Sequence, residues 1–269
     1  MTSNGDVHAF SDKHSVKEVV VSFFVVPSID SVEAYGKLIC AGGSLHDDYH
    51  KFELIKQVDF QIKQGNENPE VRELHNAGFK LIGFKNGRAS KIIQGINEPG
   101  RSLFTFNSVD YTNWKCFYND MLCSARKVSS FSPFFTVIAI SLLYIDEFYF
   151  DDKTAYNASN LFNENSKFLP RDIMDCSTVD FNLNVARNKN GYNYIENLSI
   201  KVLDEAVKKR IQIIDNISFV LIKPTPLQVL LNKDQSDLCS LLNFAHTENK
   251  NELIDILNDN ICKKIKIKK

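Results

Sequence analysis

The stretch SVDYTNWKCFYNDMLCSARKV (residues 108–128), followed after a short break by FFTVIAISLLYIDEFYF (residues 134–150), decides the fold. The first part has apolar residues three and four positions apart, the spacing of an amphipathic helix. These residues are Tyr111, Trp114, Tyr118, Met121, Ala125 and Val128. The second part is apolar and β-favouring on both faces, which is typical of a strand that is covered on both sides. The sequence therefore predicts a helix, carrying the only Trp, that leads into the most buried strand.

The composition sets outer limits on fold and function. The 269 residues suffice for one large or two modest domains with a substantial core. The 20 Phe residues suit a sheet-rich core. With 32 basic and 33 acidic residues, the net charge of -1 argues against a generally basic nucleic-acid-binding surface. The basic run at 263–269 is the exception, and it reads as a solvated tail or as a tail that touches phosphate or membrane.

The ends of the chain and its cysteines indicate a compartment. Residues 1–15 are polar, lack the apolar core of a signal peptide and are expected to be disordered. No apolar run reaches the roughly 18–20 residues of a membrane helix. The six Cys residues therefore read as small hydrophobes in a reduced environment. We expect a cytoplasmic protein with no membrane contact.

The chain before the Trp114 helix reads as a meander. Residues 16–27 form a strand that ends at Pro27, residues 30–39 a short helix, and residues 49–62 one or two strands. Asn86-Gly87 predicts a tight hairpin, because a type I′ turn needs positive φ at both central residues. A second turn at 97–100 and a strand at 102–106 follow, and the side chain of Ser108 or Asp110 is expected to cap the helix.

From residue 131, with the long strand as its first element, the chain repeats this order of elements. Residues 151–176 lack periodicity, and the strands expected next are 179–186, 192–202 and 211–222, with a turn at 188–191. A helix is expected over 236–261. We therefore predict an α+β fold of two similar halves, 16–130 and 131–262, each an antiparallel β-meander with an amphipathic helix packed on one face, followed by a basic tail at 263–269. Duplication is a hypothesis from element order alone.

Several motifs resemble a sporadically distributed prokaryotic protein family that has no assigned activity. The motifs are structural, cover most of the chain and include an opening strand and a closing helix. They are Val16-x-Glu18-Val19-Val20-x-Ser22-Phe23, Gly78, Asn86-Gly87, Phe104-x-Phe106, Tyr111-x-x-Trp114-x-x-Phe117, Leu142-Leu143-Tyr144-Ile145-Asp146, and Leu241, His246 and Leu253. The resemblance implies an accessory gene, as in defence or stress islands, and no mechanism.

This chain departs from the family at the long strand. The family strand usually carries two Arg residues and ends in Tyr-x-Asn, whereas apolar residues such as Leu143 and then Asp146 stand at these places here. Any binding that depends on those Arg residues is therefore not expected in this chain.

His46-Asp47-Asp48-Tyr49-His50 is the clearest polar cluster. In a helix, His46 and His50 would share one face, as two metal ligands require, with an Asp nearby. A third ligand is missing, and the preceding Gly-Gly argues against a helix. A polar loop is the alternative interpretation.

The carboxylates at the exit of the long strand are the candidate catalytic groups. Asp146 and Glu147, with Asp151 and Asp152 after them, have the chemistry to hold Mg²⁺ or to act as acid and base, as in a metal-dependent nuclease. A solvated strand end is the alternative.

The aromatic residues around the helix are the candidate contact surface for a partner or ligand. They are Tyr111, Trp114, Phe117 and, on the long strand, Tyr144. Base stacking and core packing are both open for the helix residues. Cys116 and Cys123, two helical turns apart, cannot pair without distortion. No phosphate-binding loop or dinucleotide fingerprint occurs, so no cofactor is predicted.

These observations favour a non-catalytic protein that binds a protein partner, or itself, through a sheet face, a sheet edge or a helix. The first alternative is a small-ligand binder with a cavity between sheet and helix. The second alternative is the metal-dependent nuclease.

Overall fold

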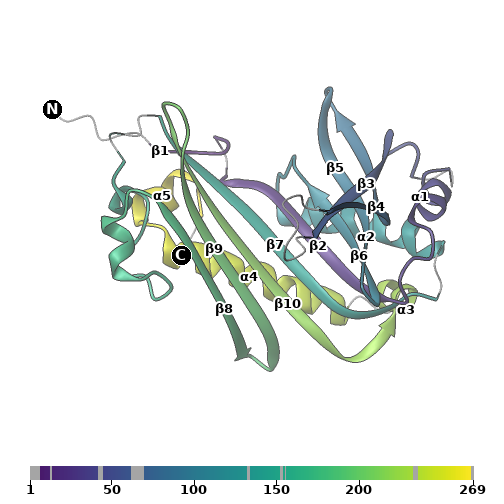
Figure 1. Ribbon diagram of the computed structural model, residues 1–269. Helices are drawn as coiled ribbons and strands as arrows, with labels where there is room; N and C mark the ends of the chain where they lie inside the picture. Colours follow the sequence, from purple (N-terminus) through teal and green to yellow (C-terminus); the bar gives the residue numbers. More distant parts are fainter. Residues whose placement is uncertain are drawn as a thin grey trace. The chain divides into compact units, whose positions relative to one another are not determined.

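The protein has an α+β fold with a mostly antiparallel sheet (Figure 1). The computed structural model describes residues 7–267 apart from 13, 42–44, 62–69, 132–133, 152–153, 155 and 233–235. Within these residues there are five α-helices. The chain forms two compact units that are each discontinuous in sequence. Unit 1 comprises residues 1–19, 141–220 and 236–269, and unit 2 comprises residues 20–140 and 221–235.

Unit 2 is built on the meander β3–β6. Its own elements are α1 (Val32–Ala41), β3 (Lys51–Gln61), β4 (Glu70–Lys85), β5 (Arg88–Glu98), β6 (Arg101–Ser108), α2 (Trp114–Ser130) and α3 (Leu227–Asn232). It also contains one end of each of three long strands, β2 (Val16–Val26), β7 (Thr136–Phe150) and β10 (Lys209–Pro226). The strand order here is β3-β4-β5-β6-β2-β7-β10.

Unit 1 holds the other ends of those three strands. It adds β1 (Val7–Ala9), β8 (Val179–Lys189), β9 (Tyr192–Asp204), α4 (Ser236–Ile256), α5 (Asp259–Lys264) and two short 3₁₀ helices, Ala158–Asn160 and Arg171–Asp175. The strand order is β2-β7-β10-β9-β8, and β1 pairs with β7. Helix α4 runs along the sheet (Figure 1), and Phe244 on this helix packs against Tyr194 and Phe219 of β9 and β10.

The predicted hairpin at Asn86-Gly87 and the predicted turn at 188–191 are both confirmed. Asn86 and Gly87 have φ of 52° and 76°, and Asn190 and Gly191 have φ of 53° and 82°. Positive φ at both central residues defines the type I′ turn that matches the twist of the paired strands. These turns set the registers of β4 with β5 and of β8 with β9.

The two elements that were expected to decide the fold are present. Helix α2 buries a face that includes Met121, Ala125 and Val128, as predicted. Its cap differs from the expectation, because Asn113 accepts the hydrogen bond from the backbone N–H of Cys116. Strand β7 has no exposed residue along its whole length, which confirms a strand covered on both faces.

The core of unit 2 is aromatic, as the Phe content indicated. Tyr35 of α1 lies 5.8 Å from both Phe104 and Phe135, measured between ring centroids. Gly36 allows α1 to approach the sheet, since a Cβ there would lie 2.5 Å from the Phe52 ring and 2.8 Å from Cγ of Phe79. This close approach fixes the helix over the meander.

The structure does not confirm two similar halves. Each unit takes residues from both of the expected segments, 16–130 and 131–262, because β2, β7 and β10 contribute one end to each unit. At 11, 15 and 18 residues, these strands are long enough to enter two cores. A division by sequence order could not reveal this sharing.

Three further details differ from expectation. Residues 7–9 pair with β7, although residues 1–15 were expected to be disordered. The expected helix 236–261 is two helices, because Leu257 leaves the helix and Asn258 caps α5. Lys263 and Lys264 of the basic tail belong to α5, while residues 268–269 lie outside the described part. Within that part, no helix is long and apolar enough to cross a membrane.

Candidate functional site

A row of charged side chains crosses the covered face of the unit 1 sheet. It consists of Asp146 on β7, Asp215 on β10, Glu196 on β9 and Arg187 on β8, which are successive strands. Glu196 lies opposite Val185 and Ile217, so Arg187 and Asp215 are its diagonal neighbours on the same face. The two aspartates and Glu196 are each at most 5% exposed. Burial of three carboxyl groups in one row requires compensation by charge or hydrogen bonds.

Helix α4 covers this row with polar side chains of its own. Asn249 donates from Nδ2 to Oδ2 of Asp215 at 2.6 Å. Glu252, three residues further along, is 4% exposed, and its carboxyl group lies beside those of Asp215 and Glu196. Glu248, one turn before Glu252, is 6% exposed. The helix therefore adds two acids to a face that already carries three.

Two cations on β8 offset part of this charge. Nε and Nη2 of Arg187 both donate to the carboxylate of Glu196, the second at 3.2 Å. Nζ of Lys189 lies 2.6 Å from the carboxylate of Glu248. Neither Asp215 nor Glu252 forms an ion pair within the part of the chain that the structure describes, and Arg187 acts on Asp215 only through its charge. Their shared environment is therefore short of positive charge.

Because positive charge is scarce here, some of the buried carboxyl groups hold a proton. Burial, and then the charge of Asp215, raise the pKa of Glu252 far above its ordinary value. Burial also raises the pKa of Asp215, against the lowering effect of hydrogen bonds from Glu252 and Asn249. The two groups share a proton at neutral pH, as closely spaced carboxyl groups do. Asp146, buried and next to Asp215, has its pKa raised to about 7.

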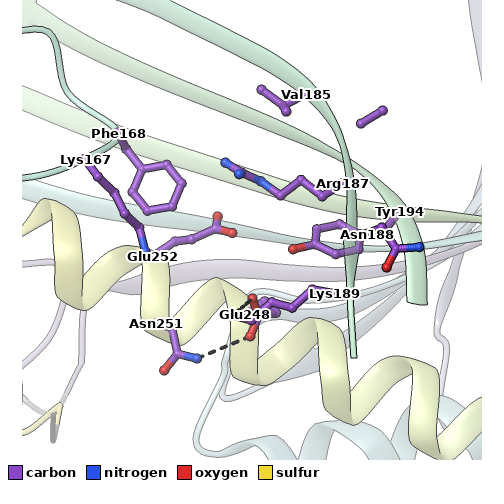
Figure 2. A pocket seen from close by; sticks show the side chains of 11 residues that line it. Lys167, Phe168, Val185, Arg187, Asn188, Lys189, Tyr194, Glu248, Asn251 and Glu252 are labelled. Atoms are coloured by element: carbon purple, nitrogen blue, oxygen red, sulfur yellow. Dashed lines mark hydrogen bonds and ion pairs between the residues drawn. The ribbon is translucent and has the colours of Figure 1, made fainter. Parts of the chain in front are cut away.

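A pocket of about 420 Å³ opens beside this row (Figure 2). It lies between β8, β9, α4 and the segment at 167–168, so it belongs to unit 1 alone. Its walls include Lys167, Phe168, Arg187, Lys189, Tyr194, Glu248 and Glu252. The volume lies in the range typical of sites for small molecules.

Two polar side chains in this pocket have an unused hydrogen-bonding atom. Oε2 of Glu252 and the hydroxyl of Tyr194 are buried and have no hydrogen-bond partner among the described residues. Figure 2 shows the Tyr194 hydroxyl pointing toward the Glu252 carboxyl group, below the Arg187 side chain. An unmet buried polar atom costs roughly 1–3 kcal/mol, so such atoms normally bind a water molecule or a ligand.

Asp146 and Glu147 do not form a carboxylate pair. Both lie inside β7, which continues to Phe150, and as neighbours on a strand they face opposite sides of the sheet. Asp146 accepts a hydrogen bond from Ser15, whereas Glu147 accepts bonds from Lys17 and Gln212 at 2.8 and 2.7 Å. Burial favours a higher pKa for Glu147, but its hydrogen bonds outweigh burial and lower the pKa. Asp151 is exposed after the strand, and Asp152 lies outside the described residues.

His46 and His50 are both exposed and are not joined by a helix. His46 lies in a turn at 45–48, and the ring of His50 lies 6.4 Å from that of Phe84. Asp48, between them, is held by Lys91 and Lys127 at 2.9 and 3.0 Å instead. In the described part of the chain, no group of three His, Cys, Asp or Glu side chains is placed to hold a metal ion.

The aromatic candidates are divided between the two units. Trp114 and Phe117, 5.9 Å apart, lie on α2 in unit 2 with Tyr111 just before them. Phe117 is buried, as expected for core packing. Tyr144 is in unit 1, where its hydroxyl bonds to Nδ1 of His246 at 2.9 Å. Burial, and then the charge of Lys250, lower the pKa of His246 to about 4, so this residue is a neutral packed His.

The main residues of the pocket were not selected from the sequence. Inward positions of β10 read Ile211, Ile213, Asp215, Ile217 and Phe219, and those of β9 include Tyr194, Glu196 and Leu198. An acid at an inward position of an alternating strand was the available signal. No protein-family model matches the chain, and no curated protein matches it.

Proposed function

We propose that the protein binds a small molecule in the pocket between β8, β9 and α4, without catalysing a reaction on it. The observation that carries this proposal is the pair of buried atoms without a partner, Oε2 of Glu252 and the hydroxyl of Tyr194, in the wall of a 420 Å³ pocket. Small-molecule sites combine such a volume with a few converging polar groups.

The elements around the pocket favour binding over structural packing. Arg187 and Lys167 lie over the ring of Phe168, at 5.4 and 5.0 Å from its centroid, so the aromatic wall is held in place by two side chains. The hydrogen bonds of Arg187 with Glu196 orient its guanidinium beside the pocket. A site with prearranged side chains loses less entropy when a ligand enters.

A substitution that fills the pocket tests the proposal. Asn251 lines the pocket from an exposed position on α4, so Asn251→Trp places a large ring in the entrance without changing the core. Asn243→Trp makes the same change at another exposed position on the same helix, away from the pocket. Both variants and the native chain would be purified from the native host and examined by native mass spectrometry.

We expect a bound small molecule with the native chain and with Asn243→Trp, and at least tenfold less of it with Asn251→Trp. Equal occupancy in all three would place the ligand elsewhere. The absence of any bound molecule, together with no binding from a metabolite extract, would overturn the proposal.

Binding of a protein partner is the second candidate, and the edge strand β8 favours it. β8 ends the strand order of unit 1 and is 11 residues long. Its outward side chains Asp180, Asn182 and Asn184 are exposed. An edge of this length offers backbone groups to a further strand. We expect Asn184→Lys to weaken such an interaction, and Asn197→Lys, on the interior strand β9, to leave it unchanged in a co-purification experiment.

A further inference from the structure

The charges around the pocket are separated by depth. Glu248 and Glu252, from adjacent turns of α4, are 6% and 4% exposed, and Glu196 lies behind them with no exposure. The cations lie further out, since Lys167 is exposed and the side chain of Lys189 is 49% exposed. A ligand that enters the pocket therefore meets cations first and acids last.

The inner end of the pocket suits a group with several N–H donors. Apart from the proton shared with Asp215, Oε2 of Glu252 has no donor among the described residues, and the Tyr194 hydroxyl can also accept. Glu248 adds a carboxylate, although Lys189 and Asn251 already donate to it, at 2.6 and 3.4 Å. A primary ammonium has three donors, and it would supply the ion-pair partner that Asp215 and Glu252 lack among the described residues.

The outer end of the pocket suits an anion. Lys167 contacts the Phe168 ring at 5.0 Å and forms no ion pair within the described part of the chain. Lys189 has only one of its donors occupied by Glu248. A carboxylate near these two ammonium groups gains charge-assisted hydrogen bonds.

Ligands with a single charge fit less well than ligands with two. A simple amine would pass Lys167 and Lys189 without a carboxylate of its own to offset their repulsion. A simple carboxylate would leave Oε2 of Glu252 without a donor. A molecule that carries both charges satisfies both ends of the pocket.

We infer, on the basis of the proposed function, that the ligand is a small zwitterion whose primary ammonium binds Glu252 and Tyr194 and whose carboxylate binds Lys167 and Lys189. Free amino acids belong to this chemical class. The aliphatic or aromatic part of the molecule would lie along the Phe168 ring, which forms one wall of the pocket.

Binding of this kind releases a proton. The groups that face Glu252 are Asp215 and Tyr194 from the sheet, Glu196 and Arg187 beyond them, and Glu248 on its own helix. Asp215 and Glu252 share a proton because neither has an ion-pair partner among the described residues. An incoming ammonium supplies that partner, so the shared proton leaves. The ammonium keeps its own three protons, and the carboxyl proton passes to the buffer.

Isothermal titration calorimetry of the full chain at pH 7 tests the inference with three probes of equal length: 5-aminopentanoate, pentylamine and pentanoate. Glycine and phenylalanine extend the set to α-amino acids. Each titration is repeated in phosphate and in Tris, whose different heats of ionisation report the number of protons released. Glu252→Gln and Tyr194→Phe serve as variants, and their thermal unfolding curves establish that they fold. Glu252→Gln is neutral, like the protonated acid that it replaces.

We expect at least one zwitterion to bind tenfold or more tightly than the amine and the carboxylate, with release of up to one proton. Glu252→Gln should abolish the proton release and weaken binding at least tenfold. Tyr194→Phe should weaken it roughly three- to tenfold, the effect of one hydrogen bond.

The outcomes separate the inference from the proposed function. Binding of pentylamine or pentanoate as tightly as any zwitterion overturns the inference and leaves the pocket as a ligand site. The same holds if no probe binds while a molecule of another class is retained by the native chain and lost in Asn251→Trp. If no probe binds and the native chain retains nothing, both fail. Binding of a zwitterion that Glu252→Gln leaves unchanged also overturns the inference.

Discussion

Ser15 donates a hydrogen bond from its hydroxyl to Oδ1 of Asp146 at 2.5 Å, which joins residues 131 positions apart in the interior of unit 1. Asp146 is buried behind this bond and close to Asp215. Asp146 of the long strand therefore lies in the core. Its place near the end of an apolar run had indicated a position in solvent. The proton on this carboxyl group therefore contributes to folding.

The first prediction concerns stability and pH. Burial raises the pKa of Asp146 from 3.8 to about 7, so the folded state holds a proton that the unfolded state has lost between these pH values. The contribution of Asp146 to the free energy of unfolding should therefore fall as pH rises from about 4 to 7, by roughly 4 kcal/mol at most, and then level off. Asp146→Asn should flatten this part of the profile, measured by urea denaturation at pH 5 and pH 8.

Asp180→Asn, at an exposed position of β8, is the control for Asp146→Asn. It should leave the difference in stability between pH 5 and pH 8 as it is in the native chain. The same change in stability between pH 5 and pH 8 in Asp146→Asn as in the native chain would contradict the assignment of a protonated, buried Asp146.

A second prediction has the opposite sign. Burial, and then Lys250, lower the pKa of His246 to about 4, below the 6.5 of a free His. The unfolded state therefore takes up a proton first, and stability should be lost as pH falls from about 6.5 to 4, by roughly 2 kcal/mol. The imidazole signals of His246 in an NMR titration should not move above pH 5.

The hydrogen bond of Tyr144 with Nδ1 of His246 holds this ring in place. Tyr144→Phe should lower stability by about 1 kcal/mol at pH 7. His246→Gln should reduce the loss of stability between pH 6.5 and pH 4. Titration of the His246 ring near pH 6.5 in the native chain would show that it is not buried as described.

Local features of the fold could be predicted because they depend on neighbours in sequence. Asn86-Gly87 and Asn190-Gly191 specify their turns through backbone conformations that few residues adopt. The face of α2 that includes Met121 and Ala125 follows from helical spacing. The sharing of β2, β7 and β10 between two units depends on strand pairing at long range, which alternation alone cannot specify.

The candidate site could be predicted only in part. Asp146 was selected, but as a member of a pair with Glu147, and the alternation of strand faces separates the two. Asp215 interrupts a row of inward Ile residues and was recognisable as a buried acid. Its relation to Glu252 was not recognisable, since it depends on how α4 is placed on the sheet.

A third prediction distinguishes packing from helix propensity in unit 2. Gly36→Ala should stabilise α1 by about 1 kcal/mol if helix propensity alone decides. The new methyl group would instead lie 2.5 Å from the Phe52 ring and 2.8 Å from Cγ of Phe79, in a packed core. We therefore expect a net loss of about 1–3 kcal/mol in chemical denaturation. Ala34→Gly, at an exposed position of the same helix, should cost about 1 kcal/mol through propensity alone.

The last prediction concerns the pair formed by Arg187 and Glu196. Glu196 has no exposure, and Arg187 is its cation, so Arg187→Met leaves a buried carboxylate without a counter-charge. Breaking a buried pair on one side costs about 3–5 kcal/mol, and the 34% exposure of the Arg187 side chain places the expected loss at the lower end, about 3 kcal/mol. Glu196→Gln removes the charge on the other side, and the double variant should recover much of the loss.

A double-mutant cycle of Arg187→Met and Glu196→Gln, followed by urea denaturation at pH 7, measures this coupling. The cycle also probes the acidic row, because Glu196 is one of the groups that raise the pKa of Glu252. With Glu196→Gln, the proton shared by Asp215 and Glu252 should be held less tightly, so the stability of that variant should depend less on pH above neutrality. Additive effects of the two substitutions would mean that Arg187 and Glu196 are not coupled to each other. An unchanged pH profile in Glu196→Gln would mean that Glu196 does not affect the proton shared by Asp215 and Glu252.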